Sequence, residues 1–179
     1  MSWLRRALLI VLAVGLVGAA IVTAAYLEDR ANYLTDSAIA AVEAGNLTKA
    51  RREATTALEL APKQPRAWWY GGVVHHANLV LGMVALRSGD LEEAKKRLLD
   101  AGRTPGSPTL GSFGPNMRLA LELLKAGQKE PVREYFRLCS AFWEMDRERR
   151  PGQLDRWTED IESGRLPDFG ANLLYGGWH

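Results

Sequence analysis

The hydrophobic positions of this chain follow two patterns, which meet near residue 28. Residues 7–27 form a run without any charged side chain, and nearly every position in it is apolar. From Asp29 onward, apolar residues recur every three or four positions, which is the period of a helix that buries one face. No segment alternates apolar and polar residues as a half-buried strand does. The sequence therefore predicts an all-α protein in which one apolar N-terminal helix precedes a set of amphipathic helices.

The apolar run is long enough to cross a membrane, because about 20 residues rising about 1.5 Å each span the hydrocarbon core. Arg5 and Arg6 precede the run, and the first acidic residue is Glu28. Positive charge at this end favours a cytoplasmic N-terminus. We therefore expect a single-pass protein of a bacterial inner membrane, with its C-terminal domain in the periplasm. Small residues around Ala24 leave a second interpretation open, in which the run is a cleaved signal sequence and the protein is secreted.

Local start and stop signals place the other helices. Asp90 and Glu93 form a capping arrangement around Leu91. No Gly or Pro interrupts residues 29–44, so nothing in the sequence requires a break between that helix and the apolar one. The prolines and glycines of residues 102–114 predict an ordered loop without helix. The predicted helices are residues 3–27, 29–44, 47–60, 65–87, 91–101, 115–126, 129–143 and 153–163, and a short turn is expected at residues 171–175.

Three glycines, Gly45, Gly89 and Gly127, separate pairs of these helices. Small or apolar residues stand five, nine and twelve positions after each glycine, which places them on one face of the second helix. Small residues or leucine stand seven and four positions before each glycine, where they let the first helix approach the second closely. The positions after the glycines are Ala50, Ala54, Ala57, Ala94, Leu98, Ala101, Val132, Phe136 and Cys139, and those before them are Ala38, Ala41, Gly82, Ala85, Ala120 and Leu123.

This spacing is similar to that of the tetratricopeptide repeat (TPR) family, whose unit is two antiparallel helices joined at a turn glycine. Pro62 stands where the family places a closing proline, and Pro105 comes within one residue of that place, but the third unit has no such proline. The glycines are spaced more widely than the family's repeat of about 34 residues, so the connections carry insertions. The resemblance covers residues 34–145.

The resemblance implies a TPR-like solenoid of helical hairpins with about three units. These units would occupy residues 28–150, between an anchor or signal sequence at residues 1–27 and a capping segment at residues 151–179. It also implies that the first helix of each unit lines a concave surface, which receives a peptide or protein partner.

Asparagines recur in the predicted first helices and near the C-terminus. Asn78 and Asn116 each stand four residues before a small residue, and the Phe-Gly-x-Asn pattern of residues 113–116 returns at residues 169–172. A carboxamide both donates and accepts hydrogen bonds, so these side chains could hold a peptide by its main chain. The alternative is that they cap helices or connect neighbouring loops. The predicted partner-binding residues are Asn78, Asn116, Asn172, Trp69, His75 and Phe113.

Composition limits the chemistry. The chain has 23 Lys and Arg against 21 Asp and Glu, and two of the arginines precede the apolar run, so the remainder lacks the basic excess of a nucleic-acid-binding protein. Cys139 is the single cysteine, which excludes an intrachain disulfide and a cysteine-based zinc cluster. His75 and His76 are adjacent and would point about 100° apart on a helix, a poor arrangement for one metal ion.

The sequence shows no nucleotide-binding, zinc-protease or nucleophile motif, and we expect no enzyme activity, no cofactor and no metal. It predicts a membrane-tethered TPR-like scaffold or adaptor that binds a peptide or protein partner in the cell envelope. A fixed accessory subunit of a larger membrane complex is the first alternative. A histidine-dependent metal protein or enzyme is the second, and the missing ligand constellation counts against it.

Overall fold

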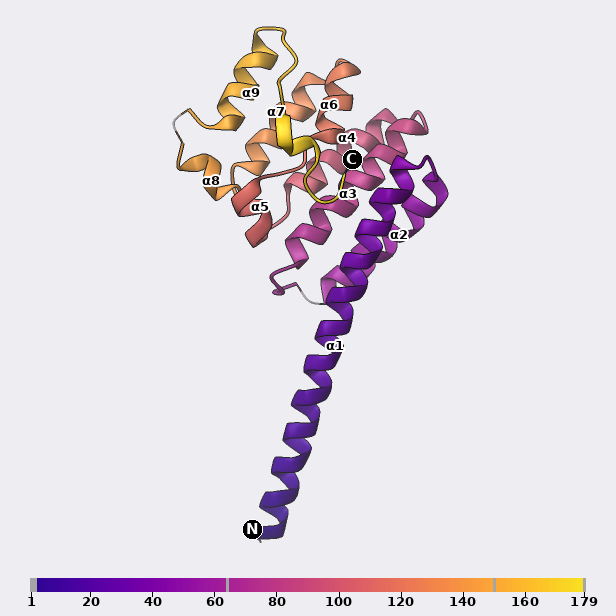
Figure 1. Cartoon of the computed structure of the whole chain (residues 1–179), viewed down its shortest axis with the longest axis vertical. Helices are drawn as coiled ribbons and strands as arrows, with labels where there is room; N and C mark the ends of the chain where they lie inside the picture. Colours follow the sequence, from indigo (N-terminus) through magenta and orange to yellow (C-terminus); the bar gives the residue numbers. More distant parts are fainter. Residues whose placement is uncertain (1–2, 64, 150, 179) are drawn as a thin grey trace.

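The computed structural model describes residues 3–63, 65–149 and 151–178, and every regular element in these ranges is helical. The first helix, α1 (Trp3–Glu43), is a single uninterrupted helix of 41 residues. Its N-terminal part projects as a stalk, and the other helices gather around its C-terminal part (Figure 1). The expectation that no break separates the apolar helix from the next one is therefore confirmed, and the predicted domain boundary at residue 27 falls inside a helix.

The remaining elements are short and lie together in the folded part of the chain (Figure 1). They are α2 (Leu47–Leu60), η1 (Ala61–Lys63), α3 (Tyr70–Arg87), α4 (Leu91–Gly102), α5 (Pro108–Phe113), α6 (Arg118–Lys125), α7 (Lys129–Cys139), α8 (Glu144–Arg147), α9 (Gln153–Glu162) and η2 (Gly170–Leu173).

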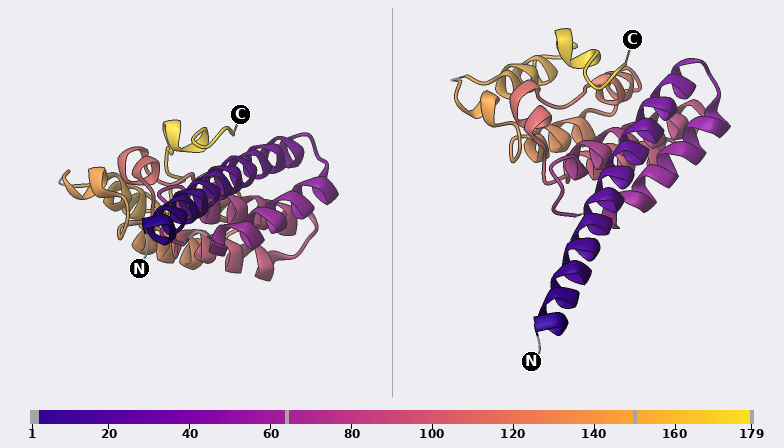
Figure 2. Two further views of the ribbon diagram at one scale, coloured as in Figure 1. Left: turned by 90° about the horizontal axis from the view of Figure 1, so that it is seen from below. Right: turned by 60° about the horizontal axis from the view of Figure 1, so that its bottom comes forward.

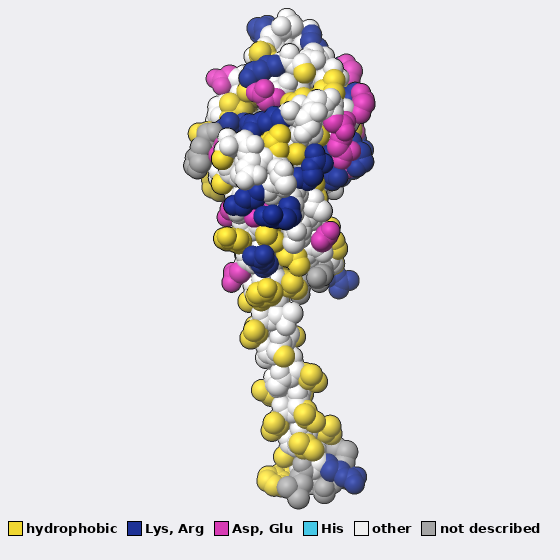
Figure 3. All heavy atoms as spheres, turned by 90° about the vertical axis from the view of Figure 1, so that its right-hand side faces the viewer, with side chains coloured by type: hydrophobic (Ala, Val, Ile, Leu, Met, Phe, Trp, Pro, Cys, Tyr) yellow, Lys and Arg dark blue, Asp and Glu magenta, His cyan; other side chains and the backbone are white. Residues whose placement is uncertain are grey.

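The apolar part of α1 meets the requirements of a membrane span. Ala7–Glu43 contains a window of 18 residues with a mean hydropathy of 2.7, and none of that window is buried inside the protein. On the face in Figure 3, the stalk carries mostly apolar side chains, whereas charged side chains are spread over the folded part. A signal sequence meets the same requirements, so the choice between an anchor and a cleaved segment stays a prediction, as does the orientation.

Glycine turns join three helix pairs, α1 with α2, α3 with α4 and α6 with α7. Gly45, Gly89 and Gly127 have φ values of 78°, 83° and 78°, a left-handed conformation that glycine adopts without a steric penalty. The residue after the first two glycines caps the next helix, because the side chains of Asn46 and Asp90 accept hydrogen bonds from main-chain N–H groups of α2 and α4. The pairs also contact one another, through α2 with α3, α3 with α6, and α4 with α7.

The helix faces that the glycine spacing predicted to be buried are buried. The positions after each glycine, from Ala50 to Cys139, are between 0% and 2% exposed. The positions before each glycine, from Ala38 to Leu123, are buried as well. Small side chains at these positions let the helices pack closely, as the sequence indicated.

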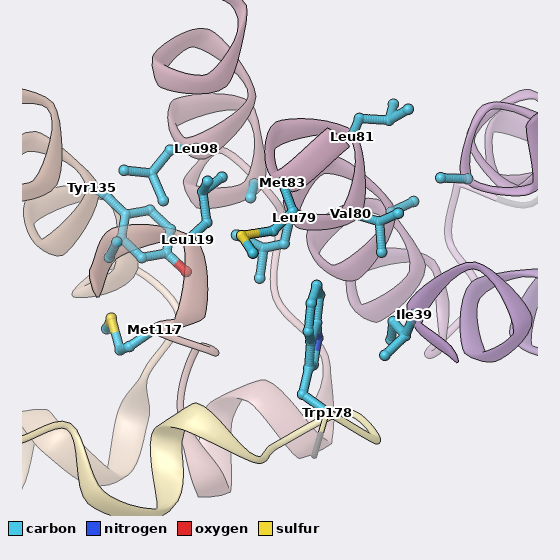
Figure 4. Packing of buried hydrophobic residues seen from close by; sticks show 14 of the residues in the cluster. Ile39, Leu79, Val80, Leu81, Met83, Leu98, Met117, Leu119, Tyr135 and Trp178 are labelled. Carbon is cyan, nitrogen blue, oxygen red and sulfur yellow. The ribbon is translucent and has the colours of Figure 1, made fainter. Parts of the chain in front are cut away.

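The C-terminal segment crosses this array of helices. After α9, which packs against α7, the chain passes through η2 and returns over α6 and α3 to α1 (Figures 1 and 4). Seen from below, this segment lies on the side of α1 that faces away from α2 (Figure 2, left). The residue Trp178, near the end of the chain, is 1% exposed and packs close to Ile39 of α1 and Leu79 of α3 (Figure 4).

Three predicted helix boundaries were wrong, and one of them is the start of the helix expected at residues 115–126, which begins at Arg118 and leaves Asn116 before it. The helix expected at residues 65–87 begins only at Tyr70, because a turn in which Tyr70 N–H donates to Ala67 O replaces its first part. The helix expected at residues 129–143 ends at Cys139, whose carbonyl accepts the N–H groups of both Phe142 and Trp143. The closed turn lets both of these adjacent aromatic side chains be buried.

The loop expected at residues 102–114 also contains a helix, α5. Ser107 caps it, since its Oγ accepts a hydrogen bond of 3.2 Å from Leu110 N, and Pro108 occupies the first turn, where a missing N–H has no cost. These two start signals outweigh Gly111 inside the helix. The prediction of a helix-free loop was therefore wrong.

Candidate functional site

The candidate site is the surface on which the C-terminal tail, defined here as residues 169–178, lies across α1, α3 and α6. We call this surface the channel and define it by Ile39, His76, Leu79, Asn116 and Arg118. These residues come from α1, α3 and the start of α6, which are the first helices of the three glycine-linked pairs. The tail passes along this surface, and its Trp178 side chain points toward Leu79 and Ile39 (Figure 4).

Asn116 is the polar centre of the channel. Its Nδ2 donates to the main-chain carbonyls of Leu173 and Tyr175, at 3.2 and 2.9 Å. Its Oδ1 accepts from Arg118 N at 2.8 Å, at the start of α6. Because both acceptors on the tail are main-chain atoms, these two hydrogen bonds do not depend on which side chains the tail carries.

Asn172 makes the reciprocal contacts from the tail. Its Nδ2 donates to the main-chain carbonyls of Phe113 and Pro115, at 3.3 and 2.9 Å. Its own carbonyl accepts from Met117 N at 2.8 Å. The two Phe-Gly-x-Asn segments therefore lie against each other: Asn172 binds the main chain of the first segment, and Asn116 binds the main chain just after the second.

His75 supports Asn116 from inside the protein. The imidazole is fully buried, and its Nε2 accepts from Asn116 N at 3.2 Å. The ring must therefore carry its proton on Nδ1, which donates to Ala101 O at 3.1 Å. Tyr135 stacks on the ring at a centroid distance of 6.3 Å, and its hydroxyl donates to Asn116 O at 2.8 Å.

Burial holds both adjacent histidines in the neutral form. Desolvation lowers the pKa of His75 to about 3, the neighbouring His76 lowers it further, and the hydrogen bond to Ala101 opposes both effects. Desolvation also lowers the pKa of His76 to about 4. The Nδ1 atom of His76 is buried without a hydrogen-bond partner, so this ring packs as an apolar group against the tail.

The tail passes His76 at a glycine. Gly176 has a φ of 79°, and a Cβ atom there would lie 2.1 Å from Cε1 of the His76 ring. Two residues later, the Trp178 indole packs close to Ile39 and Leu79 (Figure 4). The Arg118 guanidinium lies 5.8 Å from the centre of the indole, within range of a cation–π interaction. The end of the tail is thus held by shape as well as by hydrogen bonds.

The structure brings together four of the six predicted partner-binding residues. Asn116, Asn172 and His75 form the hydrogen-bonded network around the tail, and the exposed Phe113 ring lies edge-on to Tyr175 at 5.7 Å. Asn116 and Asn172 connect neighbouring segments of this chain, which is the structural role that the sequence left open.

Asn78 and Trp69 take no part in the hydrogen bonds around the tail, although Trp69 lines a small cavity together with His76 and Gly176. Asn78 donates to Val74 O at 2.9 Å and accepts from Arg97 of α4 at 3.1 Å, so its carboxamide joins two helices. The Trp69 side chain is buried just before α3, whereas its neighbour Trp68 is 62% exposed. Contact of any of the six residues with a partner stays a prediction.

Sequence reasoning missed His76, Gly176 and Trp178 as parts of this site. The available signal was the Gly-Gly-Trp sequence that follows the second Phe-Gly-x-Asn segment, because two glycines before a large aromatic residue suit a chain that turns closely over a neighbour. In the part of the chain that the structure describes, no three His, Cys, Asp or Glu side chains are placed to hold a metal ion.

Comparisons of the chain with protein-family models, with curated proteins and with solved structures give no match. The resemblance to the TPR family therefore depends on residue spacing alone and remains a hypothesis.

Proposed function

We propose that this chain is a membrane-tethered helical-repeat scaffold of the TPR kind, which holds a short segment of a protein partner in the channel. The observation that supports this most directly is the pair of hydrogen bonds from Asn116 to main-chain carbonyls at the end of η2 and just after it. In the structure these carbonyls belong to the chain's own tail. A partner segment with a large aromatic side chain in the place of Trp178 would bind by replacing it.

The tether in this proposal is α1. Arg5 precedes its apolar part, and the helix continues without interruption into the folded part, so the channel is carried at a fixed distance from the membrane. The proposed orientation places the N-terminus in the cytoplasm and the folded part in the periplasm. Confinement next to a membrane raises the effective concentration of the scaffold for other membrane components.

The alternative, a fixed accessory subunit of a membrane complex, has its own supporting observation. The tail leaves no open channel, because Trp178 is buried and the asparagine side chains are hydrogen-bonded within the chain. If the tail never leaves, the channel only stabilises the fold of this chain, and partners would then bind the outer surface. The two functions differ in whether the tail can be displaced.

Weakening the tail in the full-length chain is expected to open the channel to a peptide. Truncating a buried tryptophan to alanine lowers stability by about 3–5 kcal/mol, so Trp178→Ala removes most of the apolar packing that holds the tail in the channel. We expect a fluorescent peptide of residues 168–178 to bind this variant at least about tenfold more tightly than the native protein, a difference of about 1.4 kcal/mol. Fluorescence anisotropy in detergent micelles measures the affinity.

Leu174→Ala is the matched control, because Leu174 belongs to the same tail but is 56% exposed. It should leave the channel closed and peptide binding at the native level. Adding Asn116→Ala to Trp178→Ala should reduce peptide binding again, since the two main-chain contacts are lost. Equal peptide binding by the native chain, Leu174→Ala and Trp178→Ala would contradict the proposal.

Amide hydrogen exchange of the unmodified chain gives a second measurement that needs no variant. The N–H of Met117 donates to Asn172 of the tail, so it becomes free to exchange whenever the tail leaves the channel. We expect it to exchange faster than the central amides of α3, through a local opening. Exchange of Met117 only at the rate of global unfolding would favour the fixed subunit instead.

A further inference from the structure

One edge of the folded part lies on the side from which the stalk of α1 leaves. The loop of residues 65–69 is the lowest part of this edge in Figure 1, and α5 and α8 lie above it and to its left. We call it the underside and define it by Arg66, Trp68, Phe113, Met145 and Arg149. All five residues are exposed, and the three apolar side chains among them are 62%, 57% and 41% exposed for Trp68, Phe113 and Met145.

The height of Trp68 above the apolar span follows from its neighbours on α1. Trp68 lines a small cavity together with Asn32, Thr35 and Asp36. Asn32 follows Leu27, the last residue of the uncharged run, by five positions, which correspond to about 7.5 Å along a helix. The headgroup layer on each side of a bilayer is about 5–7 Å thick. A bilayer that ends at Leu27 would therefore place Trp68 at the outer part of its headgroups.

Helix α1 fixes the distance between the membrane span and Trp68. Residues 27–43 belong to the same uninterrupted helix as the apolar run, and Ala31, Leu34 and Ala38 are buried against the folded part. No linker separates the stalk from the underside. The underside must therefore stay close to any membrane that α1 crosses.

The side chains of the underside suit a headgroup layer. Residues 104–117, which include α5, contain no charged side chain. On α8 and the residues after it, the exposed Glu144 and Glu148 are balanced by Arg147 and Arg149. Trp and Tyr concentrate at membrane interfaces because their rings are apolar with one polar group.

The stalk carries such aromatic residues next to the underside. Tyr26 and Tyr33 are exposed on α1, and the Arg30 guanidinium lies 5.7 Å from the centre of the Tyr33 ring. At the other end of the apolar run, Trp3 is exposed as well. Aromatic residues therefore mark both limits of the span.

We propose that the underside faces the lipid headgroups, with the Trp68 side chain inserted among them and with α5 and α8 further from the membrane. This inference depends on the proposed membrane tether. The bilayer is then a binding partner of the folded part and fixes its orientation. A rigid orientation would present the tail-filled channel in one direction relative to the membrane.

Quenching by nitroxide-labelled lipids tests this arrangement in full-length protein in vesicles of phosphatidylcholine and phosphatidylglycerol. Trp68→Cys, Phe113→Cys, Tyr26→Cys and Leu166→Cys each provide one site for an environment-sensitive dye. The native Cys139 is fully buried and does not compete for the label. Leu166 is the matched control, because it is an exposed apolar residue in the segment after α9, away from the underside.

Nitroxides on the headgroup should quench the dye at Trp68 strongly and the dye at Phe113 to a smaller extent, and they should leave the dye at Leu166 unchanged. Quenching at Tyr26 reports separately on the tether. Strong quenching at Tyr26 with equal, weak quenching at Trp68 and Leu166 would overturn the inference and leave the tether intact. Absence of quenching at Tyr26 would overturn both.

Discussion

Acidification from pH 6.5 to pH 5 is expected to lower the free energy of unfolding by about 3 kcal/mol. His75 and His76 are held neutral by burial in the folded state, with pKa values lowered to about 3 and about 4. In the unfolded chain both rings bind a proton below about pH 6.5. The unfolded state therefore binds more protons throughout this interval, and the loss from each histidine rises from about 0.7 kcal/mol per pH unit at pH 6.5 toward about 1.4 kcal/mol per pH unit at pH 5.

The sign of this effect follows from the lowered pKa values. The contribution of each histidine is fully present above the unfolded pKa, and it is lost as the pH falls toward the folded pKa. Burial of Asp36 raises the pKa of that carboxyl group and acts in the opposite direction, because the folded state then binds the proton more readily. One carboxyl group near pH 5 offsets only part of the loss from two histidines.

Protonation of His75 would also act on the channel directly. Its Nε2 accepts the Asn116 N–H, and a protonated ring would bring a second donor to that contact. We therefore expect the tail network to fail early during acid unfolding.

Urea unfolding of the full-length chain in micelles, followed by circular dichroism at several pH values, measures the effect. His76→Gln is the informative variant, since it removes one titrating group while its Nδ1 has no hydrogen-bond partner to lose. The slope of stability against pH between 5 and 6.5 should fall to about half in this variant. A native profile that is flat over this interval would show that the histidines are not held neutral as the structure indicates.

Local sequence signals were sufficient for the helix pairs. Each of the turn glycines at positions 45, 89 and 127 is followed by small or apolar residues at fixed offsets, and a helix places such positions on one face whatever lies further away. The burial of Ala50, Ala54 and Ala57 could be predicted without knowing which residues they pack against. The start of α5 was missed because Ser107 and Pro108, which favour a helix start, stand among glycines that argue against one.

The path of the tail could not be derived in the same way. Contacts such as that of Gly176 with His76 or of Trp178 with Ile39 join residues that are far apart in the sequence, and no periodicity records them. The asparagine argument reached the right chemistry, since a carboxamide does bind main-chain carbonyls at Asn116. It could not identify the segment that receives these bonds, which in the structure belongs to the same chain.

Gly71→Ala is expected to lower the free energy of unfolding by about 3 kcal/mol, the upper range for overpacking a core. A Cβ atom at Gly71 would lie 1.7 Å from the main-chain oxygen of Gly106 and 2.5 Å from its carbonyl carbon. These are backbone atoms and cannot turn away as a side chain would. The nearby Thr104 hydroxyl donates to Gly71 O at 2.7 Å, so moving the loop away also strains a buried hydrogen bond.

The adjacent Gly72→Ala is the matched control, because it makes the same substitution one residue further along α3. Its Cβ would meet nothing closer than Ser107 Oγ at 3.5 Å, an ordinary contact. Alanine is the better helix former by up to about 1 kcal/mol, so this variant should be unchanged or slightly more stable. Equal stability of the two variants in urea unfolding would mean that α3 and the Gly106 loop do not approach as closely as the structure shows. A large loss at Gly71 alone would instead establish that contact, which also positions the loop leading to α5 and, beyond it, to Asn116 in the channel.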